Sequence, residues 1–254
     1  MAERDDRWTV AAIAALAFVF VNVLHEVVGH GLPYVLQGGR DVVFTPARPV
    51  FEQLLSREAG IWIDLGGPVP TILLGLLSLA IAVRPGHPTF RLFLTAFGAF
   101  AMFWNLGYAP WSLIVREADW HQIARALGDA PALRWAIGVT GTMGYVATAF
   151  FVRRLIQRLG GPRARRLALL LWLGGSVAAT AGGLLDPRGL LPGLAAALPA
   201  GALAALPLLL IWNSGGPAST QMPVVERCRL WQASAFVATA LYVFWFGPGV
   251  GVSL

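Results

Sequence analysis

The chain has 254 residues, of which 57% are hydrophobic and only 13% are charged, whereas an average soluble domain carries about 25% charged residues. A soluble protein of this size could bury one or two long apolar helices but not seven, so the composition excludes an ordinary soluble enzyme. The net charge of +6 comes from 19 arginines without a lysine; in a membrane protein such an excess first reports orientation, and it gives little reason to expect nucleic-acid binding.

Uncharged stretches recur along the chain at about the 20-residue length that a helix needs to cross a bilayer. Tryptophans such as Trp8, Trp111 and Trp212 stand near the ends of these stretches, where their amphipathic rings favour the headgroup level. We therefore predict an all-α, multi-pass integral membrane protein, a bundle of about six to seven transmembrane helices in a prokaryotic cell membrane. The seven stretches are residues 8–24, 65–83, 92–115, 135–152, 167–185, 189–225 and 230–254.

The connection after the first span, residues 32–60, contains Gly38-Gly39, Pro46 and Pro49 and cannot form one helix. Within it, residues 41–45 (Asp-Val-Val-Phe-Thr) have the composition of a strand and are flanked by turn residues. We expect a short strand-like or re-entrant segment directly after the first helix.

Arginine counts predict an orientation. The segment 153–166 holds six arginines, and the positive-inside rule places it in the cytoplasm. If all seven stretches span, the N-terminus is also inside, and that side collects 12 arginines against 7 on the other. The end of the first span then faces outward.

Ionisable groups inside membrane spans are expensive and default to a functional interpretation. The first span ends in residues 25–30, His-Glu-Val-Val-Gly-His, which place His25, Glu26 and His30 together. In the related metalloprotease pattern H-E-x-x-H, two histidines one turn apart bind zinc and the glutamate between them is the general base. Interfacial histidines with hydrogen bonds and a solvated Glu26 are the simpler alternative. The lone Cys228 excludes a cysteine metal cluster and an internal disulfide.

The spacing of the two histidines is one residue longer than in that pattern. At about 100° per residue, positions i and i+5 of a regular helix lie roughly 140° apart, which is wrong for chelation. A π-type turn absorbs the extra residue, and Gly29 permits such a distortion at little steric cost. The form H-E-x-x-G-H is also similar to the zinc motif of the dipeptidyl peptidase III family.

A catalytic zinc site usually needs a third protein ligand besides water. The sequence offers Asp64, which could instead cap the second span, and Asp119, which could instead be a solvated helix-end acid. Glu117 and His121 are weaker candidates because both lie in an openly polar stretch.

The order of these features resembles the site-2 protease family, intramembrane zinc metalloproteases that cut substrate helices. The resemblance covers about residues 9–130. Residues 66–71 (Gly-Gly-Pro-Val-Pro-Thr) look like the family's A-G-P-x-x-N segment, with Thr71 in place of Asn. Residues 105–110 followed by Asp119 look like the family's N-x-x-P and D-G region, with Trp120 in place of Gly. In the family this Asp supplies the third zinc ligand, and the site lies toward the cytoplasm.

The resemblance implies a metalloprotease-like membrane core in residues 1–130, with additional transmembrane helices in residues 131–254. Zn²⁺ would be held by His25, His30 and Asp119, with Glu26 as the catalytic base. The implied partners are the lipid bilayer and a transmembrane protein or peptide substrate, which could pair as an extended strand with residues 41–45. A catalytically inactive scaffold of the same fold and a proton or cation transporter that uses His25, Glu26 and Asp64 remain alternatives.

Overall fold

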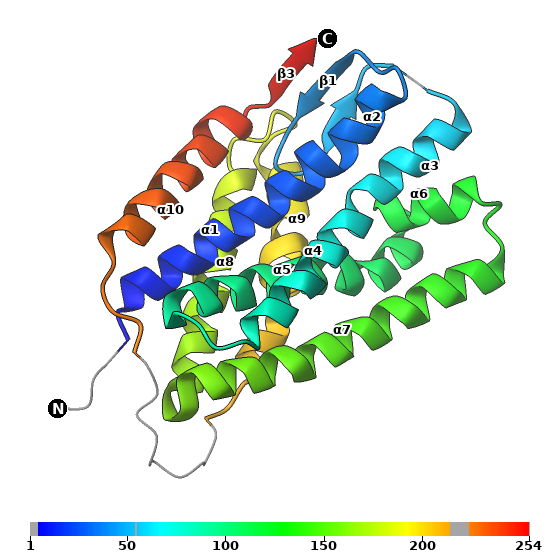
Figure 1. The fold of residues 1–254 in the computed structure, drawn as a ribbon. Coiled ribbons are helices and arrows are strands. Elements are labelled where there is room, and N and C mark those ends of the chain that lie inside the picture. Colours follow the sequence, from blue (N-terminus) through cyan, green and yellow to red (C-terminus); the bar gives the residue numbers. More distant parts are fainter. Residues whose placement is uncertain (1–4, 54, 214–223, 254) are drawn as a thin grey trace.

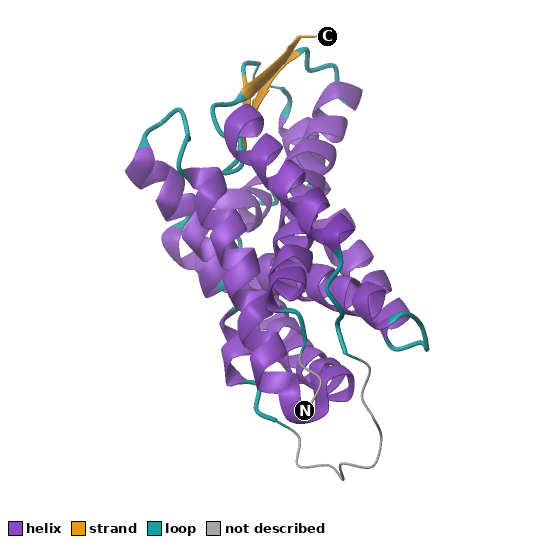
Figure 2. Cartoon of the chain, turned by 90° about the vertical axis from the view of Figure 1, so that its left-hand side faces the viewer, coloured by secondary structure: helices purple, strands orange, loops and turns teal. Residues whose placement is uncertain are grey.

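A computed structural model of the protein describes residues 5–53, 55–213 and 224–253. It is mostly helical, with a small sheet at one end of a helical bundle (Figures 1 and 2). The apolar stretches in the sequence become helices because a chain without water to satisfy its backbone must pair its N–H and C=O groups within each segment.

The first span is one continuous helical segment. It begins with α1 (Arg7–Val23), continues as a π-helix, η1 (Leu24–Gly31), and ends in α2 (Leu32–Leu36). Asp6 caps its start by accepting a hydrogen bond from the backbone N–H of Thr9 at 2.8 Å.

The sheet has three antiparallel strands in the order β2-β1-β3. The strands β1 (Asp41–Phe44) and β2 (Pro49–Phe51) form a hairpin. Thr45 stabilises the turn between them, since the Thr45 hydroxyl donates to the carbonyl of Arg48 at 2.8 Å. The distant strand β3 (Val250–Ser253) pairs with the other edge of β1, with Asp41 opposite Ser253. Of the expected strand at residues 41–45, residues 41–44 form the central strand and Thr45 belongs to the turn.

The remaining elements complete the helical bundle (Figure 1). The helix α3 (Arg57–Gly66) leads almost directly into α4 (Pro68–Ala82), and α5 (Pro88–Val115) is followed by the short α6 (Ala118–Ala126). The later elements are α7 (Pro131–Gly160), η2 (Gly161–Arg163), α8 (Ala164–Gly183), α9 (Leu190–Leu198), η3 (Pro199–Leu203), η4 (Leu206–Leu210), α10 (Arg229–Leu241) and η5 (Tyr242–Phe246).

Five helical segments of the described chain are long and apolar enough to cross a membrane: Arg7–Leu36, Arg57–Ala82, Pro88–Val115, Pro131–Gly183 and Leu190–Leu210. The fourth of them contains both α7 and α8. A helical protein with this number of apolar segments is a membrane protein by composition, as the sequence predicts.

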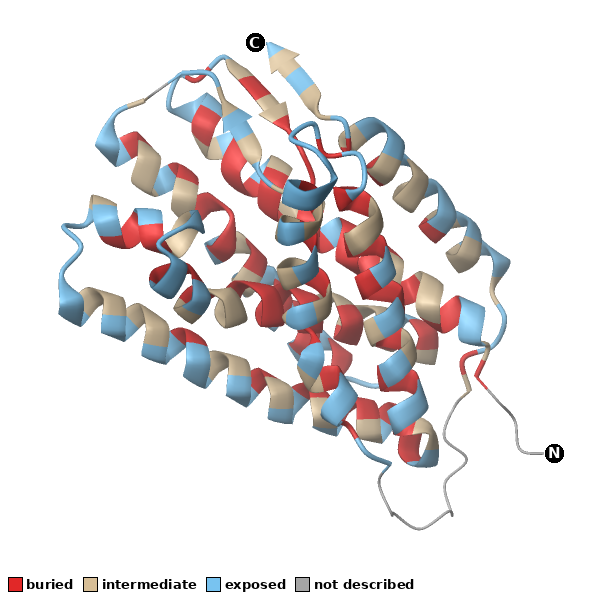
Figure 3. Cartoon of the chain, turned by 180° about the vertical axis from the view of Figure 1, so that it is seen from behind, coloured by how far each residue is buried: buried red, intermediate tan, exposed pale blue. Residues whose placement is uncertain are grey.

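Buried residues follow the inner faces of the helices, whereas α7 and α10 expose much of their surface (Figure 3). The exposed side chains are themselves apolar, such as Met143 and Phe236, as expected for surfaces that contact lipid. Small residues bring helices together: a Cβ on Gly174 would lie 2.3 Å from the carbonyl oxygen of Ala11. Close backbone contact of this kind is typical of membrane helices, where packing drives association.

Candidate metal centre

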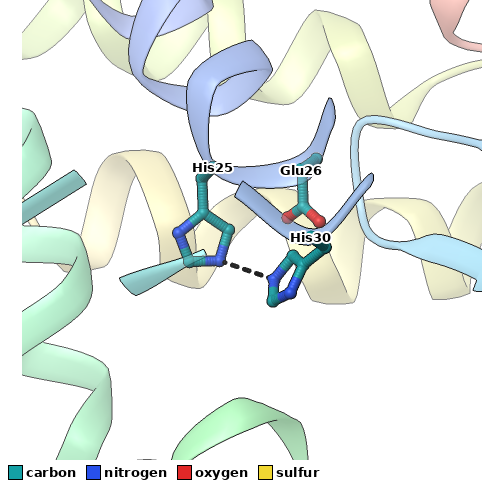
Figure 4. A group of neighbouring side chains, drawn as sticks. All are labelled: His25, Glu26 and His30. Carbon is teal, nitrogen blue, oxygen red and sulfur yellow. Dashed lines mark hydrogen bonds between the residues drawn. The ribbon is translucent and has the colours of Figure 1, made fainter. Parts of the chain in front are cut away.

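The π-helix η1 places the two histidines on one face. Hydrogen bonding from residue i to i+5 makes five residues about one turn, so His25 and His30 stand side by side. Their Nε2 atoms lie 3.3 Å apart (Figure 4). The prediction that the longer spacing is absorbed by a π-type distortion is confirmed.

Glycines allow η1 to approach the next span. A Cβ on Gly29 would lie 2.6 Å from the carbonyl oxygen of Gly66, and one on Gly66 would lie 2.0 Å from the carbonyl oxygen of Gly29. The backbones of η1 and the α3–α4 junction therefore touch directly. This contact brings the carbonyl oxygen of Ile63 within 2.7 Å of His30 Nδ1.

The hydrogen bond to Ile63 fixes the tautomer of His30. A carbonyl oxygen can only accept, so Nδ1 carries the proton and a neutral His30 directs the lone pair of Nε2 toward His25. The ring of His25 is held by stacking on Trp104, with centroids 4.5 Å apart and an interplanar angle of 27°. Both imidazoles thus point their Nε2 atoms into the same small space.

Asp119 enters this space from α6. One carboxylate oxygen, Oδ2, lies 3.2 Å from His25 Nε2, and the other, Oδ1, lies 3.6 Å from His30 Nε2. Burial acts to raise the pKa of Asp119, but when the imidazoles carry Nε2 protons, the charge of His30 and the hydrogen bonds from both rings outweigh burial and hold the pKa well below its usual value. The group is therefore an ionised carboxylate that faces two nitrogen atoms.

The α5–α6 turn that delivers Asp119 is strained. Arg116 and Ala118 have φ of 61° and 65°, a left-handed conformation that costs about 1–2 kcal/mol per non-glycine residue. Contacts around the turn hold it: the Ser112 hydroxyl donates to the carbonyl of Glu117, and the backbone N–H of His121 donates to Ser112 Oγ at 3.0 Å. The Trp120 indole donates to the carbonyl of Asn105 at 3.0 Å.

The three side chains fit a metal ion in size and chemistry. With metal–ligand bonds of about 2.0–2.1 Å, tetrahedral ligand atoms lie roughly 3.4 Å apart, close to the 3.2–3.6 Å separations of His25, His30 and Asp119. The backbone leaves the space open at Gly67, where a Cβ would lie 2.4 Å from His30 Nε2 and 2.8 Å from His25 Nε2.

Glu26 lies beside the histidines (Figure 4). It is 3% exposed, and one of its carboxylate oxygens lies within 4.8 Å of a ring nitrogen of each histidine. His25, Glu26 and His30 thus form a buried cluster that could hold a metal ion.

The cluster opens into a cavity of about 730 Å³ at the sheet end of the bundle. Its walls include the β1–β2 turn at residues 46–49, Phe51 of β2, and a side formed by small residues and prolines of α9 and η3 such as Pro192 and Ala196. This cavity gives the buried cluster access to water and to ligands.

The other candidate metal ligands predicted from the sequence lie at different positions relative to the cavity. Asp64 lies inside α3 and lines the same cavity; the residue that precedes α4 is Gly67, so Asp64 does not cap that helix. Glu117 lines the cavity, whereas His121 is buried and is not among the lining residues. Thr71 is fully buried and its hydroxyl donates to the carbonyl of Gly67 at 2.7 Å.

Two residues around the centre were not identified from the sequence. Trp104 stacks on His25, and the Tyr108 hydroxyl donates to Asp119 Oδ2. Both belong to an apolar stretch of α5 in which aromatic residues are ordinary. The available signal was their position, since Tyr108 lies inside the segment 105–110 and Trp104 directly precedes it.

No protein-family model matches the chain, and no curated protein or solved structure matches it. The function of the chain is therefore inferred from the residues of the site.

Proposed function

We propose that this protein is an intramembrane zinc metalloprotease similar to the site-2 proteases. The observation that carries the proposal is the convergence of His25, His30 and Asp119 within 3.2–3.6 Å of one another, at a buried point on an apolar helix, with Glu26 beside it. Two neutral imidazoles and one carboxylate are a ligand set that suits Zn²⁺.

The roles follow from the positions of these side chains. A bound zinc ion would supply Lewis acidity, which lowers the pKa of water and polarises a peptide carbonyl. Glu26 would take a proton from the attacking water and pass it to the leaving amine, so Glu26 ends the reaction in its starting protonation state. The hydrogen bond to Ile63 and the stacking on Trp104 keep both imidazoles oriented throughout.

The sheet suggests how an extended substrate would enter. Both edges of β1 are paired, so the segment 41–45 has no edge left for the substrate pairing expected from the sequence. The outer strands are β2 and β3, and of these only β2 lines the cavity, through Pro49 and Phe51. The Arg48 carbonyl accepts from the N–H of Thr45, directly after β1, and the Glu52 N–H donates to the carbonyl of Asp41. Alternation therefore turns the Phe51 N–H and C=O outward. We therefore place substrate pairing at β2.

The decisive experiment changes Glu26 to Gln, which preserves shape but cannot accept the proton. Purified wild type and Glu26→Gln are reconstituted in vesicles with a panel of transmembrane helical peptides, and products are identified by mass spectrometry. Cleavage should fall by about 10²–10⁴-fold while the bound zinc is retained. Glu58→Gln, on the exposed first turn of α3, is the matched control and should cleave as wild type does.

Other outcomes identify the alternatives. Full cleavage by Glu26→Gln would show that Glu26 is not the base. Zinc binding without cleavage of any peptide by wild type would favour the inactive scaffold. A transporter is favoured if wild type binds no zinc and moves protons or cations across the vesicle membrane, with Asp64 in the same cavity as the relay group.

A further inference from the structure

The carboxylate of Asp119 needs a restraint to remain against the histidines. It sits in the first turn of α6, beyond a strained turn, and its side chain is 18% exposed on the cavity side. Glu26 and Asp64 line the same cavity, so ionised carboxylates there repel Asp119. Rotation about its side-chain bonds would carry Asp119 away from the two Nε2 atoms.

Tyr108 supplies the opposing contact. Its hydroxyl donates a hydrogen bond to Asp119 Oδ2, the same oxygen that lies 3.2 Å from His25 Nε2. The donor comes from α5 and the acceptor from α6, so the bond crosses the α5–α6 turn. The indole of Trp120 makes a second crossing to the Asn105 carbonyl, which leaves the two helices little freedom to separate.

We propose that Tyr108 is a positioning residue that holds Asp119 in the orientation in which its carboxylate ligates the metal. The inference rests on the proposed metal centre and adds to it the group that makes Asp119 a competent ligand. A hydrogen-bonded carboxylate is oriented before the metal arrives, so less freedom is lost on binding. Groups that orient metal ligands in this way typically change metal affinity by about 10–100-fold when removed.

The test is Tyr108→Phe, which removes the hydroxyl and keeps the ring. Metal-free protein in detergent is titrated with Zn²⁺ against a chelator of known affinity, and separately with Co²⁺, whose visible absorption reports the number and symmetry of the ligands. Tyr108→Phe should bind Zn²⁺ about 10–100-fold more weakly, with a weakened or shifted Co²⁺ spectrum. The control is Tyr145→Phe on α7, which loses a hydroxyl that donates to the Ala204 carbonyl at 2.9 Å; its affinity and spectrum should equal those of wild type.

A double-variant cycle shows whether Tyr108 acts through Asp119. Asp119→Ala should weaken Zn²⁺ binding more than Tyr108→Phe does, and adding Tyr108→Phe to Asp119→Ala should cause no further loss. A general packing role would weaken binding equally in both backgrounds, and that result overturns the proposal. Wild-type affinity in Tyr108→Phe, with one zinc bound per chain in both proteins, would also overturn it and leave the proposed protease intact. Absence of metal from wild type would contradict both the proposed role of Tyr108 and the proposed zinc metalloprotease.

Discussion

At the scale of single residues, the two histidines carry the metal hypothesis. His25 and His30 both direct Nε2 into one space, so each should be indispensable for metal binding. We expect purified wild type to hold about one zinc per chain, and His25→Ala or His30→Ala to lose it, as measured by elemental analysis. His87→Ala, at the exposed residue before α5, should keep the zinc. Equal metal content in wild type and the double histidine variant would contradict the metal site.

The sequence could predict some of these residues better than others. His25, Glu26 and His30 are neighbours along the chain, so their spacing alone predicts a cluster. Asp119 could be identified only by a resemblance, because it lies 89 positions after His30 and a strained turn returns it to the site. Tyr108 could not be identified, since its partner is defined by how α6 folds back on α5.

At the scale of elements, the centre depends on close contact between η1 and the α3–α4 junction. Gly67 has φ of −67°, which alanine also adopts, so Gly67→Ala would act only through its new methyl group. That methyl would lie 2.4 Å from His30 Nε2, in the space assigned to the metal. We expect Gly67→Ala to lose zinc while it remains folded by circular dichroism and thermal unfolding.

The matched control for this prediction lies on α3. A Cβ on Gly60 would meet no atom within 4 Å, so Gly60→Ala should keep wild-type zinc content. If Gly67→Ala bound zinc as tightly as Gly60→Ala, the metal could not occupy the space between the two histidines and Gly67.

The elements themselves differ in how far the sequence predicts them. The π-helix η1 follows from the spacing of two histidines that must share a face. The strand β1 follows from its β-branched and aromatic composition. In contrast, β3 is a short Val-Gly-Val-Ser segment that becomes a strand because it pairs with the edge of β1. No local sequence pattern predicts this pairing.

At the scale of the whole molecule, the apolar stretches predict a membrane bundle, but they do not predict which helices meet. The contact of α1 with α8 depends on a small residue, because a Cβ on Gly174 would lie 2.3 Å from the carbonyl oxygen of Ala11. Gly175 of α8 likewise leaves room for the ring of Phe100 of α5. Glycines are frequent throughout the chain, and only the packed structure shows which of them allow a helix to approach another.

The bundle also places the metal centre far from the arginine-rich segment 153–166. Arg163 forms an ion pair with Asp5 beside the start of α1, whereas His25 lies 18 residues beyond Arg7, about 27 Å along a helix. If all seven apolar stretches span, 12 of the 19 arginines share the side of the segment 153–166 and 7 lie on the other side. The positive-inside rule therefore predicts that the cavity opens on the non-cytoplasmic side, opposite to the placement usual in site-2 proteases.

Cysteine labelling can test this orientation. In a Cys228→Ser background, a cysteine is introduced either at Gln37, exposed beside the sheet, or at His87, exposed at the opposite end of the bundle. In right-side-out vesicles, a membrane-impermeant maleimide should label Gln37→Cys before lysis and His87→Cys only after it. The arginine count decides this expectation because moving arginine-rich loops outward is disfavoured during insertion. The reverse pattern would place the cavity toward the cytoplasm, and the substrate would then be cut from that side.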